Sequence, residues 1–527
     1  MSKAADLAKT STKASFNYLW GLVISTVISS LGTIFVANLL GSDAYGLYGI
    51  ALTVPTLIML FRDWGINSAM VRYTAQYRAE NRVAEIRSIF VSGILFEIVF
   101  GLLLSIVSFL ISGYLAVDIY NRPEITSLIQ IASFSVLASG LTNAATAVFT
   151  GTEETKYNSI MMICQSFVKT FLIIGLVIAG LGTSGAIIGF TIASMVAGLI
   201  GLTFTAILYH RMPKPFSHKL EIRAYTKEML TYSIPISLST IISGFLAQFY
   251  VVLLPYFFTD NSLIGNYYAA QNFVILIGFF SLPITTMLFP AFSKLDIKKE
   301  RASLKNIFQF SVKYSSVIVV PVAALVMCLS TQAVTTLFGN SYGSAPLFLA
   351  LMAINYLFCA TGNLSIGNII NSQGHTKVNL KFILLTAAIG FPMGYLLIMN
   401  YGVFGLIFTT ICAPIPSLIL SLIWVKKHFD LSVDWVSSAK ILASSAITAT
   451  LTYLFVSFTG FASIIELLLG AVFYVAVLIV VLMFTKTLYV ADLNSLRAMT
   501  TGLGPISKIV SFILNTMEKV MIKFNLC

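Results

Sequence analysis

Charged side chains are scarce in this chain. Asp, Glu, Lys and Arg make up 10% of its 527 residues, against about 25% in an average soluble domain. A soluble protein with 57% hydrophobic residues could not cover its own surface. The hydrophobic residues form continuous runs of about 20 residues, the length of a spanning helix, and not the alternating segments of a barrel. The composition therefore predicts an all-α, polytopic membrane protein.

Other signals are missing as well. The five cysteines are scattered and no two have metal-ligand spacing, so we expect no metal and no cofactor. No nucleotide-binding loop is present, which argues against an ATPase. The net charge of +12 comes from residues that flank apolar runs, so we expect no nucleic-acid partner. The N-terminus shows no signal-peptide cleavage pattern, and the first apolar run is expected to remain in the mature protein.

The basic residues alternate from one side of the runs to the other. Connections after even-numbered runs hold segments such as VRYTAQYRAENRVAEIR, whereas those after odd-numbered runs are short and nearly free of them, as in GSDAYG. Of the 32 Lys and Arg residues, Arg122 alone falls on the odd side and Lys169 lies inside a run. Positive residues stay on the cytoplasmic side, so we predict a multi-pass protein of the cell (cytoplasmic) membrane with both termini cytoplasmic. The fourteen expected spans are 16–40, 45–62, 88–112, 126–150, 158–180, 184–209, 228–257, 263–289, 306–330, 344–370, 378–399, 402–425, 437–458 and 462–484.

Short segments recur about 220 residues apart. ETKYN at 154–158 returns as HTKVN at 375–379, Gly182 matches Gly402, and Gly46 matches Gly265. The repeat unit holds six spans, an even number, so both copies are expected to insert with the same orientation. This predicts two six-helix lobes in parallel repeat plus two C-terminal helices. The expected parts are an N-terminal lobe (1–210), a cytoplasmic linker (211–227), a C-terminal lobe (228–425), helices 13 and 14 (426–485) and a cytoplasmic amphipathic tail (486–527).

Two charged residues lie deep inside apolar runs. Lys169 is about 11 residues from each end of its span, roughly 16 Å deep at 1.5 Å per residue. A charge at that depth is costly, so it should face a wet cavity or a partner. We interpret Lys169 as a phosphate-binding cation, with a structural ion pair as the alternative. Glu97, at matching depth in the third span, is its expected partner; alternatively, Glu97 could carry a proton or a cation.

Further polar residues complete the predicted substrate-binding set. Arg62 and Asp63 lie at the inner mouth of the second span and either gate the substrate or anchor the helix at the interface. The basic connection that follows either faces anionic lipid or captures a pyrophosphate. Amides and aromatic residues within the spans suit a sugar, although each could equally join helices. These residues are Gln248, Tyr267, Gln271, Asn272, Asn143 and Asn363.

Three stretches resemble one known superfamily. They are ANLLGSDAYGLYGIALTVPTLIMLFRDWGINSAMVRYTAQY at 37–77, GTEETKYNS before the fifth span, and GLGTSGAIIG before the sixth. They resemble the multidrug/oligosaccharidyl-lipid/polysaccharide exporters, and within these the oligosaccharide-lipid flippases of polysaccharide biosynthesis. The resemblance implies two six-helix lobes and a polyprenyl- or dolichyl-linked saccharide that is moved from the inner to the outer leaflet. In the related lipid II flippases cationic residues hold the pyrophosphate, and a basic residue occupies a place comparable to that of Arg62.

Two other functions fit the sequence less well. A cation-coupled drug or small-molecule exporter of this superfamily usually needs a buried carboxylate in the first or seventh span, and both spans lack one. A membrane glycan polymerase or ligase would need large catalytic loops, and the outer connections are too short. We therefore predict a non-enzymatic flippase that works by alternating access. Its expected partners are a lipid-linked saccharide, membrane lipids and glycosyltransferases of the same pathway.

Overall fold

The computed structural model describes residues 3–62, 64–213, 221–293 and 300–485, together with positions 487, 515 and 518. Within these residues every regular element is helical, which confirms the predicted all-α class. The expected tail at 486–527 lies outside the described residues apart from those three positions. The predicted linker at 211–227 is described only at its two ends.

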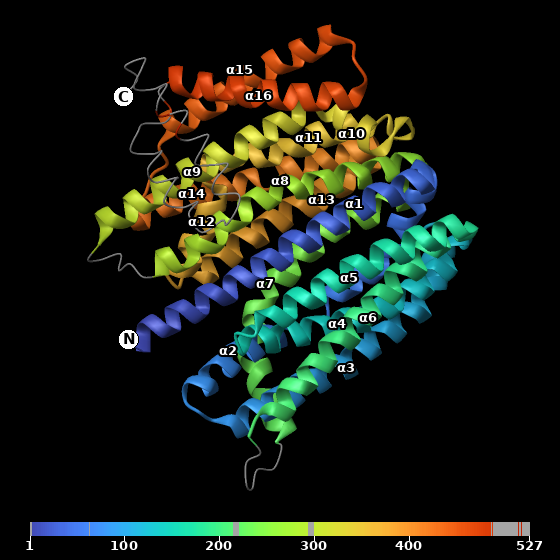
Figure 1. Cartoon of the computed structure of the whole chain (residues 1–527), viewed down its shortest axis with the longest axis vertical. Helices are drawn as coiled ribbons and strands as arrows, with labels where there is room; N and C mark the ends of the chain where they lie inside the picture. Colours follow the sequence, from blue (N-terminus) through green and yellow to red (C-terminus); the bar gives the residue numbers. More distant parts are fainter. Residues whose placement is uncertain are drawn as a thin grey trace. The chain divides into compact units, whose positions relative to one another are not determined.

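Sixteen α-helices follow one another in the described part of the chain (Figure 1). Their bounds are α1 Lys3–Leu60, α2 Ile66–Ala79, α3 Val83–Tyr114, α4 Thr126–Gly151, α5 Thr155–Leu176, α6 Gly182–Arg211, α7 Ile222–Phe257, α8 Asn261–Ser293, α9 Arg301–Cys328, α10 Ser330–Phe338, α11 Ala345–Leu357, α12 Asn363–Ser372, α13 Thr376–Cys412, α14 Ile415–Phe429, α15 Trp435–Thr459 and α16 Ser463–Phe484. Short 3-10 or π segments join some of them: η1 Leu115–Ile119, η2 Pro123–Ile125, η3 Val177–Leu181, η4 Asn340–Tyr342 and η5 Phe358–Thr361.

Some of these helices contain two expected spans that meet at a glycine. α1 is interrupted at Gly41 (φ 74°) and α13 at Gly402 (φ 57°). Glycine adopts a positive φ at little cost, so the chain turns back there without a long loop. Such joined spans count once. Nine described segments are therefore long and apolar enough to cross a membrane, or ten when the bent pair α11–η5 and α12 is one span. The expected number of fourteen stays a prediction.

The first of two compact units contains Met1–Ala269 and Ala387–Thr409. In this unit α3, α4, α5 and α6 lie alongside one another, and α1 packs along α5 (Figure 1). The α1–α5 contact is close, because a methyl group added at Gly21 would overlap with Ser159 and one at Gly32 with Thr170. Small residues permit such an approach of helix backbones in apolar surroundings. Lys169 belongs to this crossing.

The second unit contains Ala270–Thr386 and Thr410–Cys527. In it α9 packs against α11 and α15, and α16 packs against α15. Tyr474 of α16 is buried, and its hydroxyl donates to the carbonyl oxygen of Pro321 in α9 at 2.7 Å. The last two expected spans are thus helices that are fastened to α9. The predicted boundaries of the two lobes stay a prediction.

The internal repeat has a counterpart in the backbone. Gly182 has φ 51° and ψ −133°, and Gly402, 220 residues later, has φ 57° and ψ −128°. An L side chain rarely adopts this conformation. The same unusual conformation at matching positions supports the repeat that the sequence suggests.

Residues that the repeat relates also contact each other within the first unit. The hydroxyl oxygens of Ser42 and Ser262, 220 residues apart, lie 2.7 Å from each other. A methyl group at Gly46 would overlap with the carbonyl oxygen of Asn261, and one at Gly265 with that of Ser42. Reciprocal contacts of this kind arise where a two-fold relation brings a surface against its own copy. We call this contact between α1 and α8 the glycine crossing.

The turns of the first unit gather at two ends. Hydrogen bonds and van der Waals contacts connect the turns that follow odd-numbered spans: Ala44 with Thr183, Ser42 with Ser262, Arg122 with Phe258, and Phe258 with Gly402. At the other end α2 contacts the turn after α4 and the start of α7. This grouping agrees with the alternation that the sequence shows. We call the two ends the predicted outer end and the predicted cytoplasmic end.

The glycine crossing predicts a large difference between two alanine substitutions. Gly46→Ala would force a methyl group against a backbone oxygen, which a side-chain rotation cannot relieve, so we expect a loss of about 1–3 kcal/mol. The measurement is the thermal unfolding midpoint of the purified protein in detergent. Gly175→Ala in α5 is the matched control, because nothing lies within 4 Å of its added methyl group. Equal midpoints for the two variants would contradict the close crossing.

Candidate functional site

Lys169 lies in α5 and reaches α1. Its side chain is half-buried, and its Nζ donates a hydrogen bond to the hydroxyl oxygen of Ser29. On the next residue, the Thr170 hydroxyl contacts the carbonyl oxygen of Ile28 at 3.3 Å. The close packing of α1 on α5 therefore holds the ammonium group against α1. In the described part of the chain no carboxylate lies within ion-pairing distance of Lys169.

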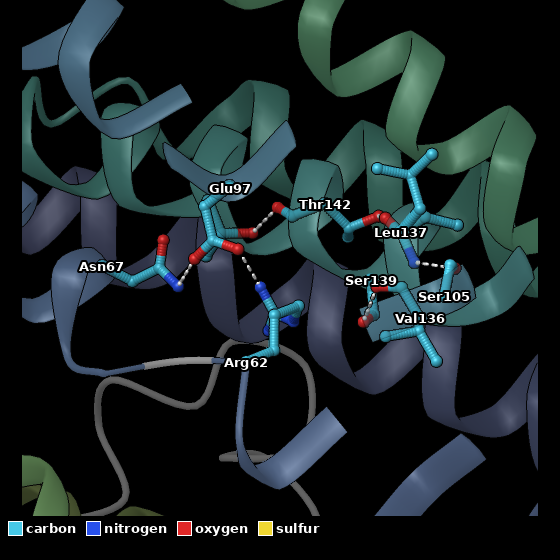
Figure 2. Close-up of polar contacts among 10 residues, drawn as sticks. Arg62, Asn67, Glu97, Ser105, Val136, Leu137, Ser139 and Thr142 are labelled. Carbon is cyan, nitrogen blue, oxygen red and sulfur yellow. Dashed lines mark hydrogen bonds and ion pairs between the residues drawn. The ribbon is translucent and has the colours of Figure 1, made fainter. Parts of the chain in front are cut away.

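Glu97 lies in α3 and has different partners. Its side chain is fully buried, and one carboxylate oxygen pairs with the guanidinium of Arg62. The other oxygen accepts a hydrogen bond of 2.8 Å from the Asn67 amide at the start of α2. Figure 2 shows Arg62 and Asn67 converging on the carboxylate from the segment between α1 and α2. We call these three residues the Glu97 cluster.

The expected pair of Glu97 and Lys169 is therefore wrong. Both residues lie deep in their helices, as expected, but they face different neighbours. Lys169 faces α1, whereas the carboxylate of Glu97 lies 3.1 Å from the position of a methyl group added at Gly140 in α4. Equal depth could be inferred from residue counts. The direction of each side chain depends on which helices pack together, and that is set by contacts across the fold.

Arg62 is the predicted residue whose surroundings differ most from the expectation of an inner mouth. Its side chain is 2% exposed, in the turn that follows α1. Burying two opposite charges is favourable only when they are paired and hydrogen-bonded. Asp63, its neighbour in the predicted set, lies outside the described residues. The Arg62–Glu97 pair thus fixes the α1–α2 turn to α3 and α4.

The rest of the predicted set is spread over both units. Tyr267 in the first unit is buried, with its ring in edge-to-face contact with that of Tyr268. Asn143 of α4 is exposed and Gln248 of α7 is half-buried. In the second unit Gln271 and Asn272 are half-buried in α8, and Asn363 is exposed at the start of α12. Their role in binding a substrate stays a prediction.

The basic connection at the predicted cytoplasmic end is engaged with the protein itself. Arg78 donates to the carbonyl oxygen of Thr152 at the end of α4, and Arg87 donates to that of Met212, beyond the end of α6, at 3.2 Å. Cations placed at helix C-termini are favourable. Hydrogen bonds from Gln76 and then from Arg82 hold the pKa of the Glu80 carboxyl below its ordinary value. These contacts support a structural role for the connection.

Sequence reasoning missed the residues that complete each contact. Ser29 lies in the first span as one of several small hydroxyl residues, and Asn67 opens the amphipathic link after the second span. A polar residue near a buried charge is the signal that could have pointed to Asn67. No pattern in the sequence distinguishes Ser29 from Ser25 or Ser30.

The fold is similar to solved structures of membrane transporters. A lipid II flippase MurJ in an inward closed conformation superposes with a TM-score of 0.66 at 16% identity, covering 87% of this chain and 97% of that one. A multidrug resistance MATE family transporter of the MOP superfamily, inward-facing, gives a TM-score of 0.64 at 14% identity, covering 79% and 98%. The fold thus defines a multi-pass membrane transporter of the multidrug/oligosaccharidyl-lipid/polysaccharide exporter class.

The sequence comparisons give the family. A family model described as polysaccharide biosynthesis protein matches residues 35–347, more than half of the chain. The chain belongs to this family, which confirms the resemblance seen in its sequence. It is also similar to the probable low-salt glycan biosynthesis flippase Agl15 of Haloferax volcanii, with 21% identity over 89% of this chain and 94% of the relative.

The Glu97 cluster predicts an asymmetry between single and double substitutions. Arg62→Met leaves a buried carboxylate without its counter-charge, so we expect a loss of about 3–5 kcal/mol, whereas Arg62→Met combined with Glu97→Leu should restore most of it. Thermal unfolding of the purified protein measures both. Arg82→Met is the control, because that side chain and both of its carboxylate partners are partly or fully exposed. A double variant no more stable than Arg62→Met would refute a pair that matters for folding.

Proposed function

We propose that the protein flips a lipid-linked oligosaccharide, joined to its polyprenyl or dolichyl carrier through phosphate, across the cytoplasmic membrane. The observation that carries this proposal is the state of Lys169. A cation within an apolar helix, contacted by a hydroxyl and by no described carboxylate, is poised for an anionic ligand. The phosphate of such a carrier is an anion of the right kind.

The partner of Glu97 supports the same reading. A free buried carboxylate beside Lys169 would compete with an anionic ligand, and Glu97 is instead held by Arg62 and Asn67. A cation-coupled exporter of small molecules is the alternative. It would need an available buried carboxylate, and Arg62 already neutralises Glu97. The balance of charge around Lys169 therefore favours an anionic cargo.

The relatives support the saccharide part of the proposal. Agl15 is named as a probable glycan biosynthesis flippase and MurJ as a lipid II flippase. The half-buried amides Gln248 and Gln271 are of the kind that a sugar head group needs, because an amide both donates to and accepts from hydroxyls. In this proposal the two lobes alternate between inward-open and outward-open arrangements, with both termini on the cytoplasmic side.

A substitution at Lys169 tests the proposal directly. Lys169→Met should reduce flipping of a fluorescent oligosaccharide linked to polyprenyl pyrophosphate at least tenfold in proteoliposomes, because a hydrogen bond to a charged group is lost. Lys169→Arg should retain part of the activity. Lys156→Met is the matched control: it begins the same helix, is exposed and pairs with Glu154 at 2.9 Å. Unchanged flipping in a folded Lys169→Met protein would rule out the proposed role.

A further inference from the structure

Arg122 is the exception to the alternation of basic residues, since it lies on the predicted outer side. The structure places it between η1 and η2, in the turn that joins α3 to α4, with a side chain only 4% exposed. Its backbone is fixed by a hydrogen bond from its N–H to the carbonyl oxygen of Ala116 at 2.7 Å. A lone cation on this side does not serve as a topology signal. Its burial therefore requires another explanation.

Half of the Arg122 guanidinium has a partner. Nη2 donates to the carbonyl oxygen of Phe258 at 2.9 Å, at the C-terminal end of α7. Nη1 is buried, and no acceptor among the described residues reaches it. A buried N–H of a charged group that is left without an acceptor costs more than an ordinary hydrogen bond gains. Such a group indicates an ion or a water molecule in its place.

Two more unsatisfied groups lie in the turns next to Arg122. Tyr120, two residues earlier, is 2% exposed and its hydroxyl has no partner among the described residues. The side-chain oxygen of Asn261, three residues after Phe258, is likewise buried and unpaired. The Tyr268 hydroxyl, by contrast, contacts Thr53 at 2.7 Å. The predicted outer end thus holds two unused donors, the Arg122 N–H and the Tyr120 O–H.

The charges that face Arg122 do not satisfy it. Glu124 and Asp43 act on it electrostatically, but both are exposed and neither forms an ion pair with it in the described structure. Burial lowers the pKa of the Arg122 guanidinium, and these carboxylates only partly oppose that effect. Water screens exposed carboxylates strongly. A small anion that accepts from Nη1 and from the Tyr120 hydroxyl would compensate the buried charge more fully.

We infer that Arg122 and Tyr120 form a second anion-binding site, at the predicted outer end, for a phosphate group of the transported lipid. This inference rests on the proposed function. Lys169 would hold the phosphate within the bilayer, and Arg122 would receive it near the outer surface. Arginine suits this task because its planar fork can bind a phosphate through two parallel N–H groups.

The contacts of Arg122 indicate when this site becomes available. Its bond to Phe258 joins the same group of turns as the contact between Ser42 and Ser262 in the glycine crossing. Separation of these turns would expose the side chain and release Nη2 from Phe258. Both N–H groups would then face a phosphate at the stage at which the cargo reaches the outer leaflet.

Binding of inorganic pyrophosphate to the full-length protein in nanodiscs tests the site, with Lys169→Met as the background so that the deeper cation does not contribute. Isothermal titration calorimetry should show binding in Lys169→Met, and adding Tyr120→Phe should weaken it about tenfold or more. Adding Arg122→Gln should abolish it, and adding Arg122→Lys should weaken it without abolishing it. Tyr120→Phe is the decisive variant, because it removes a hydroxyl that bonds to nothing described and should leave thermal stability unchanged.

The outcomes separate this inference from the proposed function. Pyrophosphate binding that is present in the wild-type protein and lost in Lys169→Met alone would refute the outer site and leave the proposed function intact. Unchanged affinity after adding Tyr120→Phe would show that the buried donors hold only water, which also refutes it. If the wild-type protein binds no pyrophosphate and Lys169→Met flips normally, the proposed function fails with it.

Discussion

The cost of removing a cation from water shapes the first unit more than any other single constraint. Three cations are buried there or half-buried, and each is compensated by a different kind of group. Arg62 has a carboxylate, Arg122 a backbone carbonyl and Lys169 a serine hydroxyl. A carboxylate neutralises a cation, whereas a carbonyl or a hydroxyl leaves most of its attraction for an anion intact. The kind of partner therefore separates a structural cation from cations that can still bind an anion.

The positions of these cations depend on how closely helix backbones approach one another. Lys169 reaches Ser29 because Gly21 and Gly32 let α1 lie against α5. Gly46 and Gly265 play the same part in the glycine crossing, where a side chain on either residue would meet backbone oxygen. Glycine weakens a helix by roughly 0.5–1 kcal/mol relative to alanine. The close contacts it permits explain why that cost is accepted here.

The sequence was a good guide wherever the property depends on spacing along the chain. Apolar run length predicted helices, the alternation of Lys and Arg predicted which turns gather at each end, and short matches at about 220 residues predicted positions with shared backbone conformation. The φ and ψ of Gly182 and Gly402 agree to within a few degrees. These features are local or periodic, so one sequence is enough to find them.

The sequence was a poor guide to which side chains meet. Residue counts place Glu97 and Lys169 at similar depth, yet they point to different helices, because depth fixes only one of the three coordinates of a side chain. Arg122 was visible as an exception among 32 basic residues, but its burial depends on the turn after α7, more than 100 residues away. Pairing across such separations is decided by tertiary packing, to which periodicity gives no access.

The repeat and the charges together suggest how a symmetric scaffold handles an asymmetric cargo. By the offset of the ETKYN and HTKVN segments, 221 residues, the counterpart of Lys169 is Gly390, where an added methyl group would overlap with the Tyr250 hydroxyl. At the same offset the counterpart of Arg122 is Gly343. One copy of the repeat thus carries cations where the other carries glycine. A lipid-linked saccharide has a single phosphate region, so a single charged copy is enough to bind it. The second copy can then supply the matching helices that alternating access requires.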